Sequence, residues 1–332
     1  MCPKQSPTNT VEIASRKPLA MTDKANVKTA FVFPGQGSQF VGMAQDLVAN
    51  YPEARAVFEQ ADAALGFALS QLCFAGPDNV LTDTINAQPA LLTHSIAALR
   101  VLQTINREAV PVFTAGHSLG EYSALVASDV MDFADGVILV RERGRLMKQA
   151  GEATPGAMAS VLGMNEIALE SVCNEAGAQI ANYNNPGQIV ISGTKDAIQR
   201  ASALAKERGA RRVVPLAVSI AAHSRLMEPA AREFTIAVNA TPMRAPSVPV
   251  ISNVTAQPLA SVEAIKHDLV AQLTSSVLWI KSIEYIVAQG VTHFVELGPK
   301  DAVAGMIRRI NSNVHAVSIG DVASVKAFGE AK

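Results

Sequence analysis

The sequence predicts an α/β protein in which a large domain with a parallel sheet carries a small inserted domain. Two segments have the pattern strand, tight loop and helix, one over residues 29–47 and the other over residues 110–127. Between residues 156 and 216 the pattern changes to strand, helix, strand, strand, helix, strand. Loops that leave parallel strands meet at one edge of a sheet, so we expect both strand–loop–helix segments to face one cleft.

The first loop follows the apolar run Thr29–Phe33 and has the sequence Pro34-Gly35-Gln36-Gly37-Ser38-Gln39. A glycine-rich turn with Ser38 as a helix N-cap and a phosphate-binding loop are the other interpretations of this segment. The G-x-x-x-x-G-K-[ST] spacing is absent and no lysine follows, which disfavours a phosphate loop. The Gln36 amide beside backbone N–H groups suits acyl chemistry better than nucleotide chemistry.

The second loop has the sequence Gly116-His117-Ser118-Leu119-Gly120, between an expected strand over 110–115 and an expected helix over 122–127. A glycine on each side of Ser118 lets the backbone turn sharply and leaves the hydroxyl exposed above the sheet, as in the nucleophile elbow of α/β-hydrolases. The next N–H and the helix N-terminus can hold an oxyanion. We therefore predict an α/β-hydrolase-like large domain with Ser118 as a covalent nucleophile.

The segment after Ala150 predicts a ferredoxin-like domain, because its elements follow the order βαββαβ. Asn184-Asn185-Pro186-Gly187 is a turn between two of its strands, and Gly209 closes its second helix. The expected elements are strands over 156–162, 179–183, 189–192 and 212–216 and helices over 165–176 and 194–208.

The insertion lies between Ser118 and two later apolar strands, so the flanking segments are expected to complete one parallel sheet. Those strands are expected over 248–252 and 292–297. Residues 1–27 contain three prolines and no apolar periodicity, which predicts a disordered leader. The predicted division is a leader (1–27), a discontinuous catalytic domain (28–152 and 218–320), a ferredoxin-like subdomain (153–217) and a C-terminal tail (321–332).

Composition limits the function classes. The 332 residues carry a formal net charge of −1 without a long block of like charges, which disfavours a nucleic-acid surface. The apolar stretches are too short for a membrane span, and no secretory signal precedes them. Three scattered cysteines and six scattered histidines form neither a disulfide framework nor a metal-ligand spacing. We therefore expect a cytoplasmic protein without a metal site.

A serine nucleophile needs a base, and His223 is the best candidate among the six histidines. It lies in a short loop just before the helical run 224–227. His117 adjoins the nucleophile, but its side chain should diverge from that of Ser118, so we predict a structural role for it. No acid between Ser118 and His223 stands out at a strand end, and Glu296 remains a competing third member of a triad.

Arg143 is the strongest indication of the substrate that the residues themselves offer. On a helical wheel of residues 133–147, four apolar residues surround it (Leu139, Val140, Leu146 and Met147). An arginine on an apolar face is costly unless an anion meets it. That anion is either a carboxylate of the protein or an anionic substrate.

Six motifs in order resemble the family of malonyl-CoA:acyl-carrier-protein transacylases, to which polyketide synthase acyltransferase domains are related. The similar region runs from about residue 28 to about residue 318. The motifs are Phe33-Pro34-Gly35-Gln36-Gly37-Ser38-Gln39, Gln88-Pro89-Ala90, Gly116-His117-Ser118-Leu119-Gly120-Glu121-Tyr122, Arg143-Gly144, Asn184-Asn185-Pro186-Gly187-Gln188 and Ala222-His223-Ser224.

The resemblance implies a role for each candidate site residue. Ser118 and His223 would be the catalytic nucleophile and base, and Arg143 would bind the free carboxylate of malonate. Gln36 and the N–H of Leu119 would form the oxyanion hole. A main-chain carbonyl near Gln272 would orient His223 in place of an acid, and we favour it over Glu296. Two further residues would line the cleft, namely Asn182 and Asn184.

The resemblance also implies a ping-pong reaction without a bound cofactor. Malonyl-CoA would acylate Ser118, and the phosphopantetheine thiol of acyl carrier protein would take the malonyl group for fatty-acid synthesis. The alternative is a polyketide-synthase acyltransferase acting in trans, since Ile220-Ala221-Ala222-His223 matches neither the usual malonyl nor the usual methylmalonyl motif. A serine thioesterase and a non-catalytic carrier-binding scaffold are the rival classes. We expect a monomer.

Overall fold

The large domain is built on a five-stranded sheet in the order β7-β2-β1-β8-β9. The computed structural model describes residues 27–330. All neighbouring strands of this sheet are parallel, as predicted. The strands are β1 (Thr29–Phe33), β2 (Phe113–Gly116), β7 (Val250–Ile251), β8 (His293–Leu297) and β9 (His315–Ile319).

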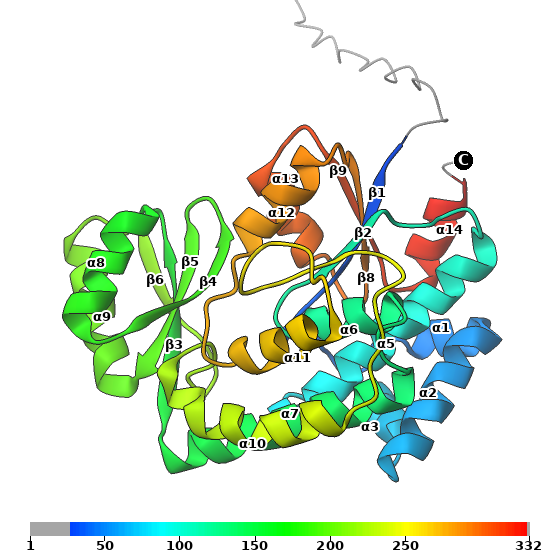
Figure 1. Ribbon diagram of the computed structural model, residues 1–332, viewed down its shortest axis with the longest axis horizontal. Helices are drawn as coiled ribbons and strands as arrows, with labels where there is room; N and C mark the ends of the chain where they lie inside the picture. Colours follow the sequence, from blue (N-terminus) through cyan, green and yellow to red (C-terminus); the bar gives the residue numbers. More distant parts are fainter. Residues whose placement is uncertain (1–26, 331–332) are drawn as a thin grey trace, which may run out of the picture.

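Helices cover both faces of this sheet (Figure 1). Side chains of a strand alternate between its two faces, so β1 contributes Phe31 and Phe33 to one core and Ala30 and Val32 to the other. The helices of this domain are α1 (Gln45–Asn50), α2 (Pro52–Leu65), α3 (Leu69–Ala75), α4 (Asp78–Leu81), α5 (Thr84–Ile105), α6 (Gly120–Ala127), α7 (Phe133–Ala153), η2 (Arg225–Met227), α10 (Glu228–Ala240), α11 (Val262–Ala271), α12 (Trp279–Ala288), α13 (Val303–Ile310) and α14 (Val322–Glu330).

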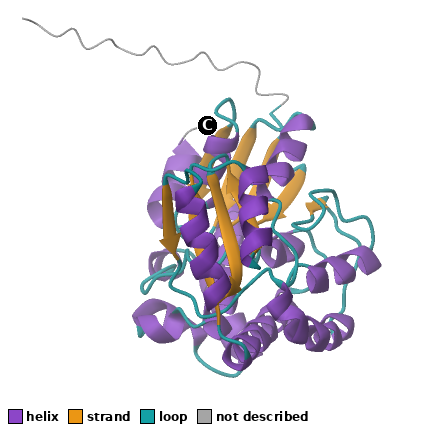
Figure 2. Cartoon of the chain, turned by 90° about the vertical axis from the view of Figure 1, so that its left-hand side faces the viewer, coloured by secondary structure: helices purple, strands orange, loops and turns teal. Residues whose placement is uncertain are grey.

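The small domain has the predicted βαββαβ order and an antiparallel sheet in the order β4-β5-β3-β6. Figure 2 views the molecule from the side of this domain. A separate apolar core lies between its sheet and its two helices. The elements are β3 (Gly156–Leu162), α8 (Glu166–Ala176), β4 (Gln179–Asn185), β5 (Gln188–Thr194), α9 (Lys195–Glu207) and β6 (Arg212–Pro215).

Main-chain hydrogen bonds join the small domain to the large one. Val277 donates its N–H to Ala181 at 2.8 Å and accepts one from Tyr183 at 3.0 Å. Segments far apart in the sequence therefore meet beside β4. The domain boundaries proposed from the sequence stay a prediction.

The ends of the chain and one strand differ from the expected pattern. The strand expected over 110–115 begins only at Phe113, because Pro111 has no N–H to donate. Most of the expected tail is the helix α14, whose Val325 is buried. Strand β9 was not predicted. The expected disordered leader lies outside the described residues except for Val27.

Candidate active site

Ser118 lies on a strained turn between β2 and α6. Its φ is +53°, a left-handed conformation that is unusual for a residue with a Cβ. A Cβ on Gly116 would lie 1.9 Å from the backbone of Gly120, and a Cβ on Gly120 would lie 2.2 Å from the carbonyl oxygen of Phe33. Only glycine fits at either position, which explains the two glycines that flank the serine in this elbow.

Asn253, just after β7, holds this turn in place. Its Oδ1 accepts the N–H of Ser118 at 2.7 Å, and its Nδ2 donates to the carbonyl of Gly116 at 2.7 Å. Sequence analysis did not single out Asn253, although it directly follows an expected strand of the parallel sheet. That position, at the carboxyl end of a strand, is where site residues usually lie and could have revealed it.

The His223 ring is positioned to act as a neutral base toward the Ser118 hydroxyl. Its Nε2 lies 2.8 Å from Ser118 Oγ, and its Nδ1 lies 2.8 Å from the carbonyl oxygen of Gln272 and 3.2 Å from that of Ser275. These carbonyls can only accept, so Nδ1 carries the proton and Nε2 is free to take the serine proton. Burial and then the charge of Arg143 lower the pKa of His223 to about 3.

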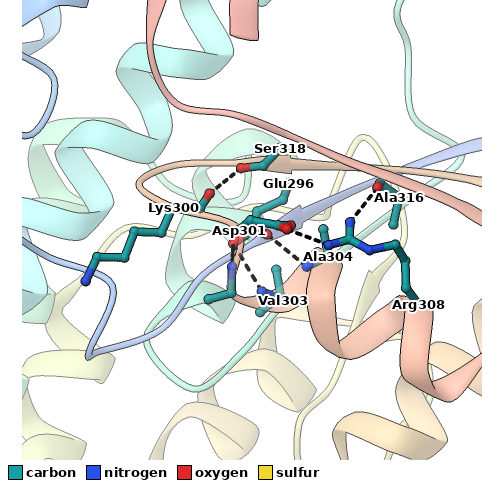
Figure 3. Close-up of polar contacts among 9 residues, drawn as sticks. Glu296, Lys300, Asp301, Val303, Ala304, Arg308, Ala316 and Ser318 are labelled. Atoms are coloured by element: carbon teal, nitrogen blue, oxygen red, sulfur yellow. Dashed lines mark hydrogen bonds and ion pairs between the residues drawn. The ribbon is translucent and has the colours of Figure 1, made fainter.

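Glu296 lies away from His223, so it is not the third member of a triad. Its carboxylate caps the start of α13, where it accepts the N–H groups of Ala302, Val303 and Ala304 (Figure 3). Burial raises the pKa of this carboxyl to about 7. Of the two groups considered from the sequence, the Gln272 carbonyl is the one beside the histidine.

Arg143 is 1% exposed and lies in the middle of α7. Its Nη1 donates to Gln88 Oε1 at 2.8 Å, and its Nη2 donates to Gln272 Oε1 at 2.9 Å and lies 3.4 Å from Ser118 Oγ. Its Nε is buried without a partner in the described part of the chain. No carboxylate of residues 27–330 forms an ion pair with it. The guanidinium beside the nucleophile is therefore held by neutral amides, and the charge of Glu121 acts on it without an ion-pair contact.

The loop after β1 approaches the elbow so closely that a Cβ on Gly35 would lie 2.5 Å from the carbonyl oxygen of His117, and two backbone N–H groups of this region are candidate oxyanion donors. Those of Leu119 and Gln36 have no acceptor among the described residues. The Gln36 side chain accepts a hydrogen bond from Thr84 Oγ1 at 2.9 Å, and Thr84 accepts one from Gln88 at 2.9 Å. Gln36 and Thr84 also line a cavity of about 310 Å³. The side-chain oxygen of Gln36 only accepts and cannot stabilise an oxyanion, whereas its main-chain N–H has no acceptor within residues 27–330 and is a candidate donor.

The two asparagines of β4 lie in different surroundings. Asn184 Oδ1 lies 2.8 Å from Nε2 of His117, so it joins the small domain to the elbow. His117 is half-buried, and desolvation of its ring lowers its pKa. Asn182 is buried beside the bridge to Val277, and its side chain has no hydrogen-bond partner within residues 27–330. Cleft lining by either asparagine stays a prediction.

Gln272 contributes more than the predicted carbonyl. Its side-chain Nε2 donates to the carbonyl of Ser118 at 3.0 Å and to Glu121, while its Oε1 accepts from Arg143. Sequence analysis assigned no role to Gln88 or Glu121, although both stand in the motifs that carry the family resemblance.

Two further observations concern cofactors and membranes. In the described part of the chain, no three His, Cys, Asp or Glu side chains gather in a way that could hold a metal ion. Across residues 27–330 no helix combines the length and apolar character needed to cross a membrane.

Comparison with known proteins identifies the family. The model of the acyl transferase domain matches residues 30–326. The malonyl CoA-acyl carrier protein transacylase of Bacillus subtilis is 46% identical to this chain, and the match covers 90% of this chain and 95% of the relative. That of Escherichia coli is 44% identical, and the match covers 90% of this chain and 97% of the relative.

Two solved structures each have a TM-score of 0.88 to this chain. The acyl carrier protein S-malonyltransferase of Vibrio cholerae is 43% identical and covers 91% of this chain and 99% of its own. A malonyl-transacylase in complex with a type II polyketide synthase acyl-carrier protein is 39% identical, over 92% and 100%. These matches show that the chain, with its elbow serine, its histidine and its buried arginine, belongs to the acyl transferase family of malonyl-CoA:acyl-carrier-protein transacylases.

Proposed function

We propose that this chain transfers a malonyl group from malonyl-CoA to the phosphopantetheine thiol of acyl carrier protein through a malonyl-Ser118 ester. One observation carries the choice of substrate. The buried guanidinium of Arg143 lies 3.4 Å from the nucleophilic oxygen and has no carboxylate partner among the described residues. An anionic acyl group bound to Ser118 supplies that partner, and a planar carboxylate fits the guanidinium in a bidentate pair.

In the first half-reaction, His223 Nε2 takes the Ser118 proton while Oγ attacks the thioester carbonyl. The N–H groups of Leu119 and Gln36 stabilise the oxyanion. The C–S bond then breaks, and the leaving CoA sulfur takes the proton from His223, which becomes neutral again. In the second half-reaction the carrier thiol gives its proton to His223 and attacks the ester, and Ser118 regains a proton as it leaves.

Intact mass spectrometry of the enzyme tests this reaction. Incubation with malonyl-CoA should add one malonyl group, and subsequent addition of holo acyl carrier protein should move that group to the carrier. Ser118→Ala, the matched control, should gain nothing. Release of free malonate faster than transfer would point to a thioesterase, and the absence of any adduct on the wild type would refute the proposal.

We place the reaction in fatty-acid synthesis, with transfer to a polyketide carrier as the alternative. Parallel assays with a fatty-acid and a polyketide carrier protein separate the two pathways by their kcat/KM. We also propose that the enzyme works as a monomer in the cytoplasm, without a bound cofactor. The proposed site is complete within one chain, and Cys73 and Cys173 are free and buried, which suits a reducing compartment.

A further inference from the structure

Two carboxyl groups without a basic partner lie beneath the nucleophile elbow. Glu121, in the first turn of α6, is fully buried, and Asp268, on α11, is 4% exposed. In the described part of the chain, neither forms an ion pair. Burial of an unpaired carboxylate is expensive, so these two groups need another explanation.

The hydrogen bonds of the two groups differ. One Glu121 oxygen accepts the N–H of Asn253 at 2.9 Å and the other accepts Nε2 of Gln272. One Asp268 oxygen accepts the hydroxyl of Ser252. The second, Oδ2, is buried and has no hydrogen-bond partner among the described residues.

The buried Glu121 and Asp268 carboxyl groups lie close enough to act on each other electrostatically, and two such groups avoid repulsion only if they hold a proton between them. Burial and their mutual repulsion raise the pKa of Glu121, and burial raises that of Asp268. The other titratable groups that face the pair are Arg143, Tyr122 and His267, of which His267 lowers the pKa of Asp268.

We propose that Glu121 and Asp268 share one proton and act as a positioning pair that fixes the amide of Gln272. With the shared proton held toward Asp268, both Glu121 oxygens can only accept, so the nitrogen of the Gln272 amide, and not its oxygen, faces Glu121. The amide oxygen then faces Arg143, which it meets at 2.9 Å. This pair presupposes the malonyl transfer proposed above, since Arg143 is the group that it ultimately orients.

A reversed Gln272 amide would weaken the hydrogen bonds that hold Arg143 in position. The nitrogen of Gln272 would then face Nη2 of Arg143, and two donors would oppose each other. Arg143 would lose an acceptor that holds its guanidinium beside Ser118 Oγ. A malonyl carboxylate would lose its alignment, whereas a neutral acyl group would not depend on it. The pair is therefore expected to influence malonyl preference more than acyl transfer in general.

Two variants of equal net charge test the pair. In Asp268→Asn the new N–H replaces the shared proton, Glu121 stays ionised and both of its oxygens still accept. In Glu121→Gln, Asp268 stays ionised, but the NH₂ at position 121 faces the Gln272 nitrogen and forces the amide to reverse. Each variant therefore keeps the single negative charge of the pair, and only Asp268→Asn keeps the pattern of acceptors.

The measured quantity is kcat/KM for acylation by malonyl-CoA and by acetyl-CoA. For Glu121→Gln we expect the ratio of malonyl to acetyl to fall about 10–100-fold, the value of one hydrogen bond to a charged group. For Asp268→Asn we expect a ratio within about threefold of the wild type. Equal ratios in the two folded variants, whether both unchanged or both reduced, would overturn the proposal.

Infrared difference spectra give a second reading that does not depend on activity. The spectrum of the wild type minus that of Asp268→Asn at pH 7 should show the C=O stretching band of a buried protonated carboxyl. The band of Glu296, whose pKa is raised to about 7, is common to both proteins and cancels in this difference. If Glu121→Gln does not fold, the difference band decides, and its absence would refute the shared proton. Failure of the proposed function is a separate result, because the wild type itself would then form no malonyl adduct.

Discussion

Replacing Arg143 by methionine tests the assignment of the substrate carboxylate. The guanidinium is 1% exposed, so a side chain of similar length is needed to avoid a large cavity. If Arg143 binds the malonyl carboxylate, acylation by malonyl-CoA should fall far more than acylation by acetyl-CoA. The preference between the two should shift, because the methyl group of acetate has no charge to lose.

The magnitude follows from the burial of the pair. Truncating one partner of a buried, hydrogen-bonded charge pair costs about 2–5 kcal/mol, much of it from the charge left unpaired. Taking about 3–4 kcal/mol and about 1.4 kcal/mol for each factor of ten gives a loss of about 10²–10³ in kcat/KM for malonyl-CoA. For acetyl-CoA the variant loses only the anchoring of Gln88 and Gln272 by Arg143, for which about tenfold or less is expected.

The assay is single-turnover acylation with each CoA ester, read by intact mass, together with a melting curve. Arg141→Met is the matched control on the same helix. Arg141 lies over the ring of Phe67 at 4.3 Å from its centroid and donates to Asn86 at 3.0 Å, away from the serine. This control should keep the malonyl preference. An equal loss of acylation rate with both CoA esters in a folded Arg143→Met protein would mean that Arg143 supports the structure and does not bind the substrate carboxylate.

Four further outcomes are expected. Ser118→Ala should form no acyl-enzyme by intact mass, and a persisting adduct would move the nucleophile elsewhere. Because the pKa of His223 in the free enzyme is lowered to about 3, kcat/KM for acylation of the wild type should stay level from about pH 8 to about pH 5; a decline centred near the ordinary histidine pKa would contradict the buried neutral base. Gln36→Ala should lower kcat by less than about tenfold, since its main-chain N–H remains, whereas a loss of 10²–10³ would assign the oxyanion contact to its side chain. Because the pKa of Glu296 is raised to about 7 in the folded state, wild-type stability from this group is present at low pH and is lost as pH rises through about 7; Glu296→Gln should remove that part of the pH dependence of Tm, and parallel curves would refute it.

Local patterns were enough to predict the elbow and the small domain. The glycines at 116 and 120 indicated a close approach of two backbones. The alternation of short strands and helices after residue 150 predicted a ferredoxin-like order. The helix α14 escaped prediction because it is short and mostly exposed, with Val325 as its buried residue. Strand β9 is likewise five residues long and half-exposed, so its pattern is weak without the neighbouring β8.

The partners of the site residues could not be predicted in the same way. Arg143 meets Gln88 and Gln272, which lie 55 and 129 positions away in the chain. A helical wheel shows that Arg143 sits on an apolar face, but the identity of its partner depends on how distant helices pack. For the same reason Asn253 and the carboxyl pair beneath the elbow emerged only from the folded arrangement.

The lack of an ion-pair contact to Arg143 among the described residues explains why an uncharged carbonyl orients the histidine. The carbonyl of Gln272 accepts from His223, and the side chain of the same residue touches Arg143. A carboxylate in that place would lie next to the guanidinium and compete with the substrate for it. The carbonyl avoids that competition, but it stabilises an imidazolium less well, which agrees with the low pKa of His223. In the proposed reaction the malonyl carboxylate offsets the charge of Arg143 and so raises the pKa of His223 in the complex. The group that selects the substrate thereby also helps His223 to hold the proton until the leaving CoA sulfur takes it.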